Sequence, residues 1–348
     1  MIDDKTRDIL NQVLYYVDPD DYQKRIEDQL NLRTNLIRNY FGKKIDTILD
    51  KNSINSPVLL TELFFSSLGE KYLAKDISER NSKKIYDYLG KLKTPVGFRP
   101  IANPEKKWRN KPRIYSTFYA IAELSLIGTL KEYLTKNDSW RHDTIRWVLS
   151  LQTKSNGGSF VESDCPSTKI PELTFWSLYI LNSLQTDAPE QFFENFENAR
   201  NWILSFLQQR NKLSATRIFF CLNCLHHFFP KFRIDSHLEN KLIKFIGELI
   251  CDNSFNEFLI NEVKAQYRKE KTSTFGLLHS TYFGLKALEM LNYDLSKFNK
   301  LKKNAQTFVK KLEPSNGGYG IPIYIKDYQL YPIITPLETI CALLIITL

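Results

Sequence analysis

The chain has few cysteines and no long hydrophobic run. Its longest apolar stretch, residues 340–348, is too short to cross a bilayer, and the opening residues MIDDKTRD are too acidic for a signal peptide. Five cysteines in 348 residues, without a secretory context, are expected to be reduced thiols. These absences favour a cytoplasmic protein.

Strand patterns, low-complexity linkers and nucleic-acid-binding motifs are also scarce. The best strand candidate is residues 319–331. No helix-turn-helix, zinc module or ribonucleoprotein motif accompanies the net charge of +9, so we expect no nucleic-acid partner. Carboxylate pairs spaced for glycan hydrolysis do not recur in the loops. The positive charge favours small anionic ligands instead.

Six apolar segments recur at a nearly fixed interval. Each contains a threonine followed by aromatic and small residues, at Thr61, Thr117, Thr174, Thr216, Thr281 and Thr339. The separations are 56, 57, 42, 65 and 58 residues, and amphipathic segments alternate with the apolar ones. A fixed period of this length indicates a repeated supersecondary unit.

The two kinds of segment predict two kinds of helix. A helix that is apolar nearly all round must be buried, whereas an amphipathic helix lies half in water. We therefore predict an all-α fold, an α6–α6 toroid in which a ring of buried helices lies inside a ring of amphipathic helices. Residues 1–55 are predicted to form an N-terminal helical cap, and residues 56–348 the toroid, within one domain.

Glycine-bearing loops separate the amphipathic and apolar segments. Gln152 precedes the sequence NGGSF at 156–160, SNGGYG follows at 315–320, and Val96-Gly97-Phe98 is a shorter copy. Glycine supplies the positive φ that lets the chain reverse after a helix. The aromatic residue after the glycines is then expected to plug between adjacent helical hairpins.

These motifs resemble the prenyltransferase and squalene-cyclase repeat superfamily. That superfamily includes the β subunits of protein prenyltransferases and the class II terpenoid cyclases. The resemblance covers roughly residues 55–348, and it is close in the third, fifth and sixth units and weak in the first and fourth. It implies an α6–α6 barrel with a deep aromatic cavity that binds an isoprenoid.

Aromatic residues on the predicted inner helices are candidates for the cavity wall. Helical spacing should turn about half of them toward the lumen, although the same stripe also fits plain core packing. The substrate-binding candidates, with His279 added from the start of the fifth helix, are Tyr115, Phe118, Tyr119, Phe175, Trp176, Tyr179, Phe219, His279, Tyr282 and Phe283.

Zinc separates the two enzyme classes within the superfamily. In protein prenyltransferases, which this chain resembles, an Asp and a Cys on one inner helix and a His on a later one bind Zn²⁺. The resemblance therefore implies ligands at the matching positions. His279 matches that histidine, but Ser214 and Thr216 stand where the other two ligands would be. Cys221 and Cys224, followed by two histidines, share a helix face and are interpreted as core residues. We predict no metal and no cofactor; Mg²⁺ would be needed only with a diphosphate substrate.

Class II cyclases need a carboxylic acid to start the reaction. The resemblance implies an Asp-x-Asp-Asp box at the mouth of an inner helix, and residues 18–21 match its letters, but they lie 40 residues before Thr61. They read as an ordinary helix start. Alignment on the threonines places Glu172 at the position of the acid. Glu338, directly before Thr339, is the second candidate for the acid. The alternative is that both glutamates simply cap their helices.

Two basic runs precede predicted inner helices. Residues 106–113 include Lys111 and Arg113, and residues 264–271 include Arg268 and Lys271. Helix N-termini favour anions, and Arg and Lys side chains can hold a diphosphate. The alternative is a pair of solvated basic loops.

Three hypotheses follow from the sequence. The first is a terpenoid cyclase that binds an isoprenoid or prenyl diphosphate and starts cyclisation with an acid. The second is a protein with a prenyltransferase β-subunit-like fold and an altered zinc site, which would act with an α-subunit partner. The third is a non-catalytic toroid that binds a lipid or a partner protein, with peripheral membrane contact.

Overall fold

The computed structural model describes residues 34–50, 59–74, 77–100, 111–152, 157–162, 170–185, 193–251, 254–255, 278–311, 319–321, 324–325, 328–329, 333–334 and 336–347. The chain forms two compact units, and the change from the first unit to the second falls between Leu204 and Ser205. The second unit also includes the beginning of the first described helix, from Thr34 to Tyr40. The predicted cap at residues 1–55 stays a prediction.

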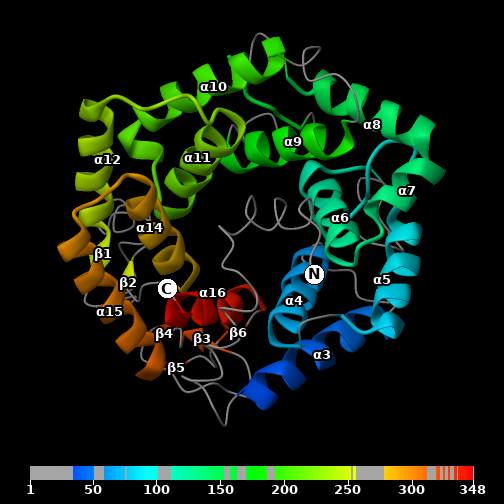
Figure 1. Ribbon diagram of the computed structural model, residues 1–348, viewed down its shortest axis with the longest axis horizontal. Helices are drawn as coiled ribbons and strands as arrows, with labels where there is room; N and C mark the ends of the chain where they lie inside the picture. Colours follow the sequence, from blue (N-terminus) through cyan, green and yellow to red (C-terminus); the bar gives the residue numbers. More distant parts are fainter. Residues whose placement is uncertain are drawn as a thin grey trace. The chain divides into compact units, whose positions relative to one another are not determined.

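In its described residues, unit 1 consists of helices joined by loops, and two isolated β-bridges, Lys93 with Phe98 and Gln152 with Phe160, lie in the loops (Figure 1). Its buried helix α6 packs against both α4 and α9, and α8 packs against α9. In chain order its helices are α3 (Thr34–Asp50), α4 (Leu59–Ala74), α5 (Glu79–Leu92), α6 (Ile114–Leu126), α7 (Leu130–Lys136), α8 (Asp138–Ser150), α9 (Pro171–Leu184) and α10 (Phe193–Leu207), the last of which ends just inside unit 2.

Unit 2 repeats this arrangement around α14, which packs against α11 and α16. Its helical elements are η4 (Arg210–Lys212), α11 (Ala215–Phe228), α12 (Ser236–Glu248), α14 (Leu278–Met290), α15 (Leu295–Lys311) and α16 (Pro336–Thr347). Its strands are β1 (Ile250–Cys251), β2 (Ser254–Phe255), β3 (Gly320–Ile321), β4 (Tyr324–Ile325), β5 (Tyr328–Gln329) and β6 (Ile333–Ile334).

The strands form three short antiparallel pairs, β1 with β2, β3 with β6 and β4 with β5. Ile250 lies opposite Phe255, Gly320 opposite Ile334, and Tyr324 opposite Gln329. Three of these strands, β3, β4 and β5, fall in the stretch 319–331 where the sequence predicts a strand. The strand prediction is therefore confirmed at these three pairs of residues, and the residues between the pairs lie outside the described part of the chain.

The predicted alternation of buried and amphipathic helices is present. All six recurring threonines lie in helices, namely α4, α6, α9, α11, α14 and α16. In α6 every residue except Tyr115 is buried, and in α14 the run 278–288 is buried except for His279. By contrast, α5 buries only Ile85, Tyr88, Leu89 and Leu92, which share one face. Burial of the apolar helices on all sides is what removes their side chains from water.

Two of the recurring threonines, Thr117 and Thr339, act as hydrogen-bond acceptors for the loop that precedes their helix. The hydroxyl of Thr117 accepts the backbone N–H of Phe98 at 2.9 Å, and the hydroxyl of Thr339 accepts that of Tyr319, also at 2.9 Å. Both aromatic side chains are buried, and the Phe98 ring contacts Trp140 of α8. In these two units the threonine therefore fixes the aromatic plug that the sequence predicts after the glycines.

Glycine is required beside this bond at Gly97. Its φ is +73°, a conformation that other residues adopt only with strain. A Cβ atom there would also lie 2.5 Å from Oγ1 of Thr117. Any side chain at this position would therefore displace the threonine hydroxyl from the Phe98 N–H.

Replacement of Thr117 by valine tests this role. Valine keeps the shape but leaves the buried N–H of Phe98 without an acceptor, so the free energy of unfolding should fall by about 1–3 kcal/mol. Thr135→Val is the control, because the Thr135 hydroxyl donates to the carbonyl of Lys131 at an exposed position. Urea unfolding should show little change in the control, and equal effects in the two variants would contradict the assignment.

Candidate functional site

An aromatic cluster crosses three buried helices of unit 1. We call it the α4–α6–α9 cluster, and its members are Phe64 and Phe65 of α4, Phe118 and Tyr119 of α6, and Phe175, Trp176 and Tyr179 of α9. Phe64 and Tyr119 have ring centroids 5.6 Å apart, and Phe118 stacks on Trp176 at 5.9 Å. Phe118 and Tyr179 form an edge-to-face pair with ring centroids 4.8 Å apart. The cluster is thus continuous from α4 to α9.

Two predicted residues lie at the helix starts beside this cluster. Glu172 is in the first turn of α9, half-buried, and Trp176 follows it one turn later. Tyr115 is half-buried in the first turn of α6. Residues one turn apart share a helix face, so Glu172 and Trp176 lie on the same side of α9.

A second aromatic cluster lies in unit 2, and we call it the α11–α14 cluster. Phe219 of α11 stacks on Phe283 of α14, with ring centroids 4.7 Å apart. Tyr282 lies against Phe283 at 5.6 Å, and the His279 ring lies edge-on to it at 6.4 Å. The predicted wall residues therefore divide into two groups, one in each unit.

The start of α16 brings Glu338 to His279. The two are 59 residues apart in sequence, yet Nδ1 of His279 lies 2.5 Å from Oε1 of Glu338. Oε2 of Glu338 also accepts the backbone N–H of His279, at 3.1 Å. One carboxyl group therefore holds both the ring and the first turn of α14. Both glutamate oxygens are engaged, and Nε2 is the ring nitrogen that remains outside this pair.

A second carboxyl group has the same position at the start of α6. Oε1 of Glu162 accepts the backbone N–H of Ile114 at 2.5 Å, and Oε2 lies 3.0 Å from Nη1 of Arg113. The sequence reasoning chose Arg113 for a diphosphate and missed Glu162. The signal available in the sequence was its place two residues after Phe160, the aromatic residue of the glycine loop.

The other basic candidates are less informative. Lys111 is exposed, just before α6. Arg268 and Lys271 lie outside the described residues, as does the Asp-rich segment at 18–21. Their proposed roles stay predictions.

A buried acid that the sequence reasoning missed lies in α6. Glu123 is only 1% exposed, and the residues of α4 that act on its carboxyl group are Ser67 and Lys71. Burial raises its pKa to about 8, partly offset by the hydroxyl of Ser67 and the charge of Lys71. It is the one charged residue in the helix sequence IYSTFYAIAELSL, and that isolation was the signal for it.

The residues at the expected zinc position do not fit a zinc site. The Ser214 hydroxyl is the N-cap of α11, accepting the N–H of Arg217 at 3.1 Å, and Thr216 is not a usual ligand. Burial raises the pKa of the Cys224 thiol well above its usual range, which disfavours the thiolate that binds metal. Among the described residues, no three His, Cys, Asp or Glu side chains are grouped around a common metal position.

Comparison with known families identifies the class of protein. Residues 32–206 and 184–329 match the family described as "Prenyltransferase alpha-alpha toroid domain". Because these matches cover most of the chain, it belongs to this family and has the all-α, α-α toroid fold that the sequence predicts. Comparison with curated proteins found no match. In the part of the chain that the structure describes, no helix combines the length and apolarity needed to span a bilayer.

Glu123 gives a testable pH dependence. Its pKa is about 8 in the folded protein and ordinarily 4.5, so between these values the unfolded chain loses a proton that the folded chain keeps. Each pH unit in that interval should then lower stability by roughly 1 kcal/mol. Glu123→Gln should remove this loss, as measured by urea unfolding at about pH 5.5 and about pH 7.5. Glu132→Gln, at a side chain 59% exposed, should behave as wild type. A wild-type slope retained in Glu123→Gln would contradict the buried-acid assignment.

The zinc position yields a second prediction. Since Ser214 caps a helix and Thr216 offers no suitable ligand, the purified protein should hold no stoichiometric zinc, as elemental analysis would measure. One zinc per chain that disappears in His279→Ala would overturn this prediction and favour a transferase site.

Proposed function

We propose that the protein is a terpenoid cyclase-like enzyme that binds an isoprenoid against the α4–α6–α9 cluster and starts its cyclisation by protonation. The observation that carries this proposal is the continuous series of aromatic rings across three buried helices. A prenyl chain is apolar, and aromatic faces attract cationic centres. The same rings would therefore suit both the substrate and the carbocation that protonation creates.

Glu172 is the proposed proton donor. A general acid must reach both the substrate and a source of new protons. Glu172 is half-buried at the start of α9, on the face that carries Trp176, so it meets both needs. Glu123 has the raised pKa of an acid but is enclosed between helices, and Glu338 is held by His279. We therefore keep Glu338 as the reserve and assign Glu123 no role in the reaction.

The basic residues would hold the substrate head group. Arg113, Lys111, Arg268 and Lys271 are proposed to meet a diphosphate, with Mg²⁺ only if such a group is present. Arg113 already pairs with Glu162, so a diphosphate would compete with that carboxylate for the guanidinium. Cys221, Cys224 and Cys341 form no disulfide within the described residues, which fits a reducing compartment such as the cytoplasm.

A prenyltransferase-like activity is the second candidate, and the His279–Glu338 pair favours it. A carboxyl group on one ring nitrogen fixes the orientation of the imidazole, as it does for histidines that bind a substrate or a metal. A protein with that activity would act with an α-subunit partner and transfer the prenyl group to an acceptor peptide. The third candidate, a toroid that binds a lipid or a protein without catalysis, predicts binding alone.

The test of the proposed acid is Glu172→Gln. Glutamine keeps the size of the side chain but cannot donate an acidic proton, so turnover should fall by about 10²-fold or more while substrate affinity stays unchanged. Wild type is incubated with farnesyl and geranylgeranyl diphosphates, and products are measured by gas chromatography with mass spectrometry.

Glu62→Gln is the matched control, because Glu62 is half-buried in the first turn of another buried helix, α4. It should retain turnover. Equal turnover in wild type and Glu172→Gln would refute the acid assignment. Products that form only when a cysteine-containing peptide and an α subunit are added would favour the transferase, and binding without any product would favour the non-catalytic toroid.

A further inference from the structure

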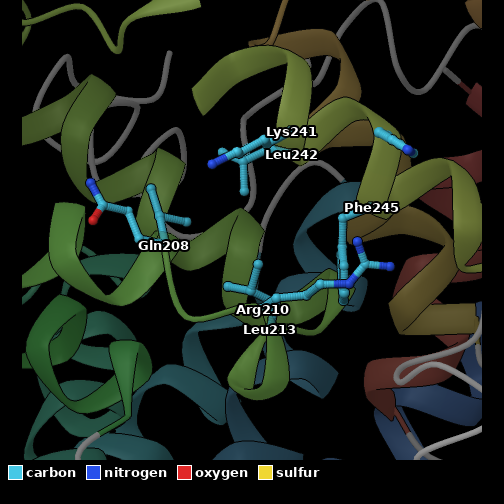
Figure 2. A pocket seen from close by; sticks show the side chains of 8 residues that line it. Gln208, Arg210, Leu213, Lys241, Leu242 and Phe245 are labelled. Atoms are coloured by element: carbon cyan, nitrogen blue, oxygen red, sulfur yellow. The ribbon is translucent and has the colours of Figure 1, made fainter. Parts of the chain in front are cut away.

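A groove in unit 2 is lined by none of the candidate site residues described above. It runs between the end of α10 with η4 on one side and α12 on the other, and it has a volume of about 330 Å³. Figure 2 shows Gln208, Arg210 and Leu213 on one side, with Lys241, Leu242 and Phe245 facing them. A volume near 300 Å³ is at the lower end of the range for small-molecule sites.

The floor of the groove is apolar and recessed. Leu207, Leu213, Leu242 and Phe245 line it, and each is at most 3% exposed. Each of these side chains also belongs to the buried core of unit 2. The groove can therefore receive an apolar group without rearrangement of these side chains.

The rim of the groove is positively charged. Lys241 and Lys244 are both exposed on α12, one turn apart, and Arg210 lies opposite them. Arg210 pairs with Glu248, and its guanidinium lies 5.7 Å from the centre of the Phe245 ring. Neither lysine forms an ion pair within the described residues. The rim thus offers two uncompensated positive charges beside an apolar floor.

We propose that this groove binds a soluble, single-chain anionic amphiphile, with an alkyl tail on the floor and a phosphate or carboxylate head between Lys241 and Lys244. The charges of the rim complement the head, and the volume admits one short tail rather than a folded peptide. The lining residues of this site belong to neither aromatic cluster, and the proposal does not depend on the proposed cyclase activity.

The surface favours a free amphiphile over a bilayer. Membrane-binding surfaces project apolar side chains into the lipid, whereas the apolar residues here are recessed behind the lysines. In the described part of the chain, Leu295 of α15 is the one large apolar side chain that is exposed, and it does not line the groove. The ligand must therefore enter the protein, because the groove offers nothing that would enter a membrane.

The proposal is tested by calorimetric titration of the full chain with decyl phosphate, below the concentration at which it forms micelles. Lys241→Glu combined with Lys244→Glu should weaken binding by about tenfold or more, the factor expected when a charged hydrogen bond is lost. The control is Lys303→Glu combined with Lys310→Glu, which changes net charge equally on the exposed side of α15 and should bind as wild type.

Three further probes test the parts of the site. Butyl phosphate should bind more weakly than decyl phosphate, since it covers less of the floor, and decyl glucoside should bind weakly because it lacks the charge. Equal affinities for butyl and decyl phosphate would refute the apolar floor. Equal binding by both double variants would refute the lysine rim, and binding to phosphatidic acid vesicles in the absence of decyl phosphate binding would overturn the proposal in favour of a membrane surface.

Discussion

The structure depends on one constraint, which is that its central helices begin inside the protein. The first N–H groups of a helix have no partner within the helix, and a buried helix cannot leave them to water. Glu162 accepts the N–H of Ile114, Glu338 accepts that of His279, and Ser214 accepts that of Arg217. The buried N–H groups of the preceding loops also need acceptors. The hydroxyls of Thr117 and Thr339 accept the N–H groups of the aromatic plugs Phe98 and Tyr319.

This constraint changes how the polar residues at the helix starts are interpreted. Two glutamates there, Glu162 and Glu338, are acceptors for backbone N–H groups, and each also holds a basic side chain, Arg113 or His279. A catalytic acid at such a position must serve a chemical step without giving up a structural bond. Glu172 differs from Glu162 and Glu338 in lying beside the tryptophan of an aromatic cluster, and the functional proposal rests on this difference.

Much of the fold could be predicted because it repeats. The interval between threonines and the contrast between apolar and amphipathic segments depend on local sequence, so both predicted the helices that the structure contains. Pairs distant in sequence could not be predicted in the same way. Glu162 lies 48 residues from Ile114 and Glu338 lies 59 residues from His279, and only packing brings them together. The groove beside α12 also escaped prediction, because its floor residues read as ordinary core positions.

Glu123 shows a different limit of sequence reasoning. Its isolation within an apolar helix was visible, but whether it faced a charged partner or an apolar surface depended on α4. The packing of Ser67 and Lys71 against it decides how far burial raises its pKa. A buried acid of this kind makes stability depend on pH without any part in catalysis.

The central claim is that the α4–α6–α9 cluster binds the isoprenoid. It is tested most directly by photo-crosslinking with a farnesyl diphosphate analogue that carries a diazirine at the end of its tail. After digestion and mass spectrometry, the account predicts label on peptides from α6 and α9, residues 114–126 and 171–184, and loss of that label with excess farnesyl diphosphate. Label confined to other segments, such as the groove beside α12, or no label that farnesyl diphosphate displaces, would contradict the account.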